Sequence, residues 1–200
     1  MLDTPLNPRE VARFLRENAN RVDKSITGEY VSKKKNAEIL RAFVASFTFA
    51  GVRIDEALRS FLEAFRLPGE APLISHILEH FAEEWHAAND NPFANTDAAF
   101  TLAYAIIMLN VDQHNKNVRK QTTPMTVKQF KTNLRKTNGN GDFDQVSLGI
   151  DSSFRMLGIC GMLNAKSFCS DACYLNCSLL FAGNARGHFR QHKRKRDSDA

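Results

Sequence analysis

Apolar residues recur every three or four positions from residue 7 to about residue 137, the spacing that places them on one face of a helix. No convincing run of alternating apolar and polar residues, the pattern typical of a strand, occurs in this part of the chain. The pattern therefore predicts an all-α protein. From Val146 onward the periodicity dissolves into a mixture of Ser, Cys, Gly and Asn, and we expect an irregular tail there.

Seven or so helices with short connections are expected. With their inward-facing residues they are a helix from Pro8 with Asn7 as N-cap (Val11, Phe14, Leu15), a short turn capped by Asp23 (Ile26, Tyr30), residues 35–47 (Ile39, Leu40, Phe43, Val44, Phe47), 55–65 (Leu58, Phe61, Leu62, Phe65), 71–86 (Leu73, Ile74, Ile77, Leu78, Phe81, Trp85), 97–111, and a helix capped at Thr126 (Val127, Phe130, Leu134). The helix over 97–111 is apolar nearly all round, so it should run through the middle of a bundle. An α-solenoid of the armadillo type fits the same series of helices.

Composition supports a folded body followed by a basic tail. The chain has 200 residues, 43% of them hydrophobic, which excludes a wholly disordered protein. Of its 27 basic and 22 acidic residues, 8 and 4 fall from Val146 onward, so the net charge of +5 belongs mainly to the tail. All four cysteines also lie in the tail, and a reducing, cytosolic compartment is expected. No signal peptide and no apolar run long enough to span a membrane is found.

The first candidate for chemistry is the turn at residues 65–71, Phe-Arg-Leu-Pro-Gly-Glu-Ala, between two strong helices. Pro68 and Gly69 predict a tight turn, and Pro72 near the start of the next helix leaves Glu70 just ahead of its free amide groups. The positive end of the helix dipole favours an ionised carboxylate at that place. The alternative is an ordinary helix-capping glutamate.

The second candidate is the end of the apolar helix, where the sequence changes abruptly to amides and charges. Met108, Asn110, Asp112 and Asn115 would lie on the rim of an apolar groove, where side-chain amides can fix the backbone of a partner. The alternative is a buried helix followed by a solvated loop.

Metal and cofactor chemistry finds little support in the sequence. His76 and His80 have a metal-like spacing, but they are expected on a solvated helix face opposite Ile77 and Phe81 and lack a third ligand. The cysteines match no zinc motif, and the glycines at 139 and 141 lack the Lys-Ser/Thr pair of a phosphate loop. We expect no metal and no cofactor.

Four motifs, taken in order, closely resemble the Sec-seven (Sec7) domain, the catalytic module of exchange factors for Arf small GTPases. They are residues 55–58 (Asp-Glu-Ala-Leu), 65–71, 93–97 (Phe-Ala-Asn-Thr-Asp) and 105–110 (Ala-Ile-Ile-Met-Leu-Asn) with His114 and Asn115. Within that family, residues 7–15, 63–65 and 112–121 are most similar to the large Golgi-specific brefeldin A resistance branch.

The resemblance implies a right-handed superhelix of helices in which Glu70 is a glutamic finger that expels nucleotide from the GTPase without covalent chemistry. It implies a GTPase-binding groove formed by Leu67, Tyr104, Ile107, Met108, Asn110, Asn115 and Met125. The positions that resemble a brefeldin-sensitive interface are Tyr104, Ala105, Asp112 and Met125, with alanine at 105 where that pattern often has serine. The implied partner is a GDP-bound Arf-family GTPase, through which the protein reaches Golgi membranes from the cytoplasm, and nucleic acid is not an expected partner.

The resemblance covers residues 3–145, and these residues are expected to form an incomplete Sec7 domain. The family's first two helices are not found ahead of Leu6, and two acidic, Leu-rich helices are expected after Gln145 but not found. One hypothesis is that residues 146–200 are intron read-through beginning at Gln145-Val-Ser. Two other functions stay open, namely an α-helical interaction scaffold or inactive fragment that binds Arf without exchange, and a nucleic-acid contact through the basic run 190–196.

Overall fold

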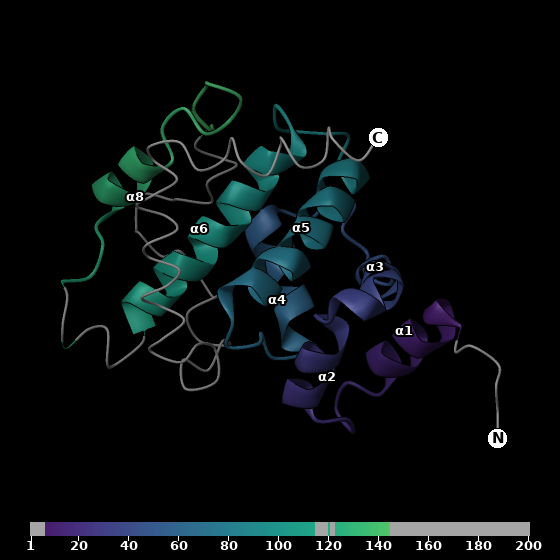
Figure 1. The fold of residues 1–200 in the computed structure, drawn as a ribbon. Coiled ribbons are helices and arrows are strands. Elements are labelled where there is room, and N and C mark those ends of the chain that lie inside the picture. Colours follow the sequence, from purple (N-terminus) through teal and green to yellow (C-terminus); the bar gives the residue numbers. More distant parts are fainter. Residues whose placement is uncertain (1–6, 115–119, 121–122, 145–200) are drawn as a thin grey trace, which may run out of the picture.

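The computed structural model describes residues 7–114, 120 and 123–144, and the regular elements among them are helices, as the sequence predicts (Figure 1). The elements are α1 (Pro8–Glu17), α2 (Lys24–Val31), the 3-10 turn η1 (Lys34–Asn36), α3 (Ala37–Val44), α4 (Ile54–Glu63), α5 (Ala71–Ala88), α6 (Thr96–His114) and α8 (Val127–Asn133). Within the described ranges the one β-type pairing is an isolated bridge between Asn138 and Gly141. The all-α prediction is confirmed, whereas the expected tail lies outside the described residues.

Side-chain caps begin three of the helices where the sequence places them. The Asn7 Oδ1 accepts a hydrogen bond from the Arg9 amide at 3.0 Å. The Asp23 carboxylate accepts two hydrogen bonds from amides in the first turn of α2, at 2.8 and 3.0 Å. At α8, Thr126 and Gln129 form a reciprocal capping box. Each cap satisfies amides that a helix leaves unpaired at its start, so local sequence fixes these boundaries.

The core between α3, α4 and α5 is a cluster of phenylalanine rings. Phe61 of α4 lies at its centre, 5.0 Å from the ring of Phe65 and 5.4 Å from that of Phe81 on α5, measured between ring centroids. The other rings of this cluster are Phe43, Phe47 and Phe49. Edge-to-face and offset stacking of this kind adds to the free energy gained from burying the rings.

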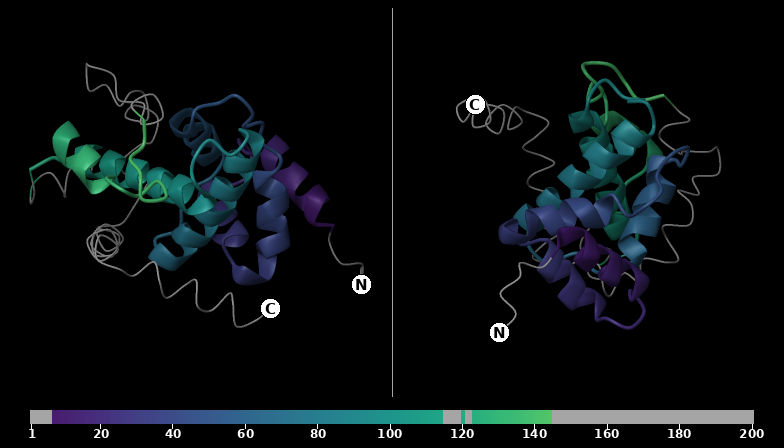
Figure 2. Two further views of the ribbon diagram at one scale, coloured as in Figure 1. Left: turned by 90° about the horizontal axis from the view of Figure 1, so that it is seen from above. Right: turned by 90° about the vertical axis from the view of Figure 1, so that its right-hand side faces the viewer.

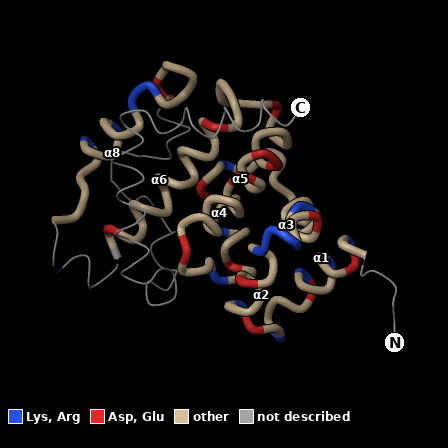
Figure 3. Tube along the Cα trace, viewed as in Figure 1, with Lys and Arg blue, Asp and Glu red and all other residues tan. Residues whose placement is uncertain are grey.

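Helix α6 is the central element, and it packs lengthwise against α5 (Figure 2). Every residue from 102 to 112 is buried. Its charged residues are Asp97 near its start and Asp112 near its end, so most of its trace is uncharged in Figure 3. The prediction of a helix through the middle of the bundle is confirmed. Among the described helices, α6 included, none has the length and hydropathy to cross a bilayer.

Two residues expected in the core are exposed instead. Phe14 is 56% exposed and Ile26 is 65% exposed. On α1 the buried residues are Ala12 and Leu15, and on α2 they include Gly28. Positions 12 and 14, like 26 and 28, differ by about 200° around a helix, so the two positions of each pair lie on opposite faces. On α2 the glycine faces inward because the Arg66 carbonyl oxygen lies against it, and Ile26 is left outside. On α1, Ala12 and Leu15 face the core and Phe14 is left outside.

The histidine pair of α5 is less exposed than the sequence predicts. The rings of His76 and His80 lie 5.0 Å apart, and the His76 Nε2 is buried with no hydrogen-bond partner among the described residues. His80 faces the Glu83 carboxylate at 3.5 Å. Burial lowers the pKa of His76, the neighbouring His80 and Lys34 lower it further, and the carboxylates of Glu79 and Glu83 act in the opposite direction. The expectation of a solvated face was therefore wrong for this pair.

This burial predicts a pH dependence of stability. Because the pKa of His76 is lower in the folded protein than in the unfolded chain, the unfolded chain binds the proton more readily. The free energy of unfolding should therefore fall as the pH drops through about 6.5, and level off below the folded-state pKa. Urea unfolding between about pH 7.5 and 5.5 should show this slope, and His76→Gln should reduce it. An equal slope in the parent and the variant would assign the pH dependence to other groups.

Candidate functional site

Glu70 stands at the N-cap position of α5, at the end of the connection from α4. Its backbone is extended (φ −110°, ψ 123°), and its carbonyl oxygen accepts hydrogen bonds from the amides of Leu73 and Ile74, both at 3.1 Å. Its side chain is exposed and makes no capping hydrogen bond. The capping alternative thus holds for the backbone position of Glu70 but not for its carboxylate.

Buried neighbours hold the rest of this turn in place. Phe65 is 1% exposed and Leu67 is 7% exposed, and Pro68 is buried as well. The chain then emerges at Gly69 and Glu70. Among the described residues no hydrogen bond or ion pair engages the Glu70 carboxylate. A free carboxylate is therefore presented at the surface, beside the positive end of an 18-residue helix.

The predicted residues on α6 come together but are covered. Those that share the low exposure, none above 7%, are Tyr104, Ala105, Ile107, Met108, Asn110 and Asp112. Met125 is partly buried against the same core, and Asn115 lies outside the described residues. Tyr104, Met108 and Asp112 recur every four positions and share one face of the helix. The structure thus places Tyr104, Met108 and Asp112 on one face of α6, with Asn110 about 200° from Asp112, and leaves little of each side chain accessible.

Asn110 carries an unsatisfied polar atom. Its Oδ1 is buried and has no hydrogen-bond partner among the described residues. A buried acceptor without a donor costs about 1–3 kcal/mol. Such an atom in the apolar part of α6 is a candidate acceptor for a donor from a partner, the role that its residue type suggests in the sequence.

Gln113, which sequence reasoning missed, joins Asp112 in fixing Met125. The Asp112 Oδ2 accepts hydrogen bonds from the Met125 amide at 2.6 Å and from the Gln113 Nε2 at 3.3 Å. The same Gln113 Nε2 donates to the Met125 carbonyl oxygen at 2.8 Å. Both backbone groups of Met125 are therefore held by the end of α6. The sequence offers no direct signal for this, because the partners are 12 and 13 residues apart and belong to no local motif.

Among the described residues, no three or more His, Cys, Asp or Glu side chains are grouped so that they could hold a metal ion. The four cysteines lie outside those residues.

Comparison with known protein families gives one decisive match, since the model of the Sec7 domain matches residues 2–149. The chain belongs to the Sec7 domain family. Among its relatives is the Golgi-specific brefeldin A-resistance guanine nucleotide exchange factor 1 homolog of Caenorhabditis elegans, 52% identical over 136 residues. Another is the ARF guanine-nucleotide exchange factor GNOM of Arabidopsis thaliana, 41% identical over 144 residues. These alignments cover 68% and 71% of this chain but only 7% and 10% of the relatives, so the Sec7 chain spans a small part of their length.

A solved structure agrees with the family. The structure of ARF1-GDP bound to a Sec7 domain complexed with brefeldin A superposes with a TM-score of 0.67 at 36% sequence identity, and covers 72% of each chain. The expectations of family and of fold class are both confirmed. The roles of Glu70 and of the α6 residues remain predictions for this Sec7 chain.

The contact between Asp112 and Met125 predicts a measurable loss of stability. Asp112→Ala removes the acceptor and leaves the Met125 amide and the Gln113 side chain short of a partner, which should cost about 1–3 kcal/mol. Asp112→Asn keeps an acceptor oxygen and should cost less. Urea unfolding measures both, and Lys128→Ala, an exposed change close by in sequence on α8, should stay within about 0.5 kcal/mol of the parent. If Asp112→Ala lowers the free energy of unfolding no more than Lys128→Ala does, the hydrogen bond from Met125 to Asp112 does not stabilise the fold.

Proposed function

We propose that this chain is the guanine nucleotide exchange module for an Arf-family small GTPase, and that Glu70 acts as its glutamic finger. The observation that carries the proposal is the exposed, unpaired Glu70 carboxylate at the start of α5, next to the buried anchors Leu67 and Pro68. Family membership supports it, because relatives with guanine nucleotide exchange in their names share 41–52% of their aligned residues with this chain.

The chemistry is electrostatic competition. A carboxylate placed beside the β-phosphate of bound GDP repels it and competes for the cations that hold it. One like-charge contact at about 4 Å, with an effective dielectric constant near 20, is worth roughly 4 kcal/mol. That free energy corresponds to about a thousandfold in nucleotide affinity. No covalent bond forms or breaks, so the module speeds exchange by binding alone.

The GTPase-binding surface would be the face formed by α6 and the segment leading to α8. Tyr104, Ile107 and Met108 supply apolar contact area, while Asn110 supplies a free acceptor. The proposed surface also includes Leu67, Met125 and Asn115. Because the α6 side chains are buried, binding requires this face to become more accessible than it is in the isolated chain. An inhibitor wedged between module and GTPase would meet Tyr104, Ala105, Asp112 and Met125.

The cellular setting follows from the same proposal. A GDP-bound Arf-family GTPase is the partner, and the module reaches the cytoplasmic face of Golgi membranes through that GTPase. We place the module within residues 3–145. The Caenorhabditis elegans relative, whose name describes a Golgi-specific exchange factor, supports this location. The chain aligns with 7% of that relative.

The test is release of fluorescent GDP from an Arf-family GTPase in the presence of the full 200-residue chain. Glu70→Lys replaces the repelling charge by an attracting one and should lower the release rate by up to about a thousandfold, toward the rate of the GTPase alone. Glu29→Lys makes the same charge change at an exposed position of α2 and should leave the rate unchanged.

The alternative functions give different results in the same experiment. A scaffold or an inactive Arf-binding fragment would bind the GTPase in a pull-down but accelerate release in neither the parent nor the variant. Equal acceleration by the parent and by Glu70→Lys would remove Glu70 from the mechanism.

A further inference from the structure

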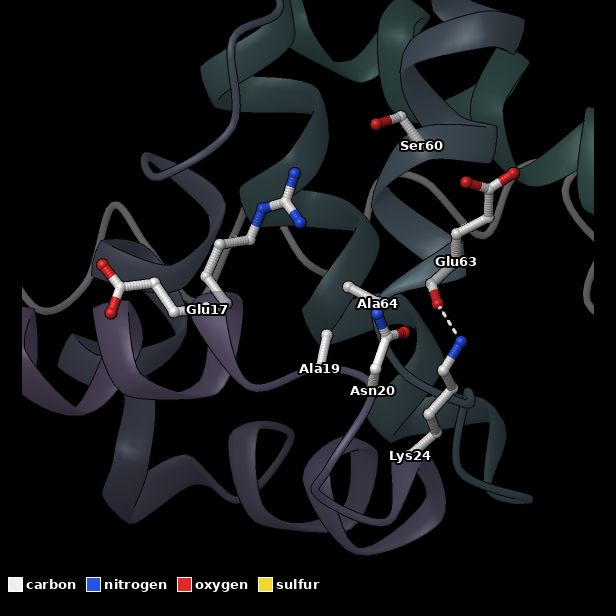
Figure 4. A pocket seen from close by; sticks show the side chains of 8 residues that line it. Glu17, Ala19, Asn20, Lys24, Ser60, Glu63 and Ala64 are labelled. Atoms are coloured by element: carbon white, nitrogen blue, oxygen red, sulfur yellow. Dashed lines mark hydrogen bonds between the residues drawn. The ribbon is translucent and has the colours of Figure 1, made fainter.

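Helix α2 touches the end of α4 at the edge of a polar cavity (Figure 4). The cavity has a volume of about 490 Å³, and the residues that line it include Lys24 of α2 and Glu63 of α4. The Lys24 Nζ donates a hydrogen bond of 2.6 Å to the carbonyl oxygen of Glu63, the last residue of α4. This carbonyl belongs to the last turn of α4, where it has no partner inside the helix. A cationic donor there supplies a charge-assisted bond and also complements the negative end of the helix dipole.

A second contact fastens the next part of the connection to α2. The Arg66 amide donates a hydrogen bond of 2.9 Å to the carbonyl oxygen of Lys24. The same residue of α2 therefore holds the chain at two points, through its side chain at Glu63 and through its backbone at Arg66. These two points lie 39 and 42 residues away in sequence, so the contacts are tertiary.

Gly28 makes this approach possible. A Cβ atom at position 28 would lie 1.8 Å from the Arg66 carbonyl oxygen and 3.4 Å from the Phe65 ring. The first distance is far shorter than a nonbonded contact allows, and the atom it meets is backbone. Any larger residue would thus force α2 away from the connection. Glycine is otherwise a poor helix residue, so its place in the middle of α2 is explained by this contact.

The two fixed points, Glu63 and Arg66, lie shortly before Glu70 in the connection between α4 and α5. Three residues separate Arg66 from Glu70, and two of them, Leu67 and Pro68, are buried. A short segment with a buried centre transmits a shift of one end to the other, because close-packed side chains leave no room to absorb it. The place of the Glu70 carboxylate therefore depends on where α2 holds residues 63–66.

We infer that Lys24 and Gly28 are positioning residues that hold the Glu70 carboxylate where it meets the nucleotide. The inference rests on the exchange function proposed above. This role requires no contact between either residue and the GTPase. They act through the connection, so they should set the maximum rate of exchange and not the affinity for the GTPase.

Lys24→Met tests the side-chain contact, since methionine keeps most of the aliphatic stem but cannot donate. In the fluorescent GDP release experiment, with the full chain varied in concentration, the maximum rate should fall about fivefold or more while the half-saturating concentration stays within about twofold. Lys24→Arg restores a cationic donor and should recover most of the rate. Lys35→Met makes the same change at an exposed lysine and should have no effect.

Gly28→Ala tests the close approach. It should lower the maximum rate more than Lys24→Met does, although alanine is the better helix former. Glu29→Ala, one residue on and exposed, serves as the matched control. A maximum rate unchanged in both Lys24→Met and Gly28→Ala would overturn the inference. It would also be overturned if the rate, the half-saturating concentration and the melting temperature of Lys24→Met all worsened together, because that result marks a purely structural role.

Amide hydrogen exchange tests the same contacts without a GTPase. Lys24→Met and Gly28→Ala should speed exchange of the Arg66 amide, which donates to the Lys24 carbonyl oxygen, about tenfold, and should leave core amides such as that of Leu78 unchanged. This readout separates the two hypotheses. If the parent fails to accelerate GDP release, the proposed function fails, and unchanged protection of the Arg66 amide in both variants still overturns the positioning role.

Discussion

An apolar helix of 19 residues cannot leave any side in water without a large cost in free energy, and α6 is such a helix. The other elements are arranged to cover it, with α5 along its length and α4 packed against it. The constraint acts most severely at its C-terminal end, where the sequence turns polar before the helix leaves the core. The buried Asp112 carboxylate accepts a hydrogen bond from the Met125 amide, whereas the Asn110 Oδ1 has no such partner among the described residues. The burial that holds the bundle together therefore fixes the backbone of Met125 through Asp112 and leaves the Asn110 acceptor unsatisfied on the opposite side of the helix.

Glu70 stands in contrast to these buried polar groups. It lies at the end of the connection from α4, and its backbone completes the first turn of α5 while its carboxylate is left in solvent. The structure thus separates the two tasks of one residue, the backbone serving the fold and the side chain remaining available. A capping Asp or Ser would have used the side chain for the helix, and nothing would then have been left to meet a ligand.

Much of this could be predicted from the sequence, because the signals were local. The caps at Asn7, Asp23 and Thr126 and the buried apolar residues of α3 and α4 depend on residues within a few positions of each other. The errors came from short helices whose inward face is chosen by a distant neighbour. Ile26 is exposed because Gly28 must face Arg66, and no pattern within α2 reveals that contact. The hydrogen bond from Gln113 to Met125 and the burial of His76 likewise depend on chain segments that the local pattern does not specify.

The ring cluster around Phe61 has a consequence for how this domain can change in evolution. Phe61 touches the rings of Phe43, Phe47, Phe49, Phe65 and Phe81, which come from two neighbouring helices and the segments that follow α3 and α4. A smaller residue at its place would leave a space bounded by five side chains, and no single one of them could fill it without leaving another gap. Substitutions in this cluster are therefore tied to one another, so relatives should exchange these residues in groups, and sequence drift should be slower here than on the surface of α1 or α2.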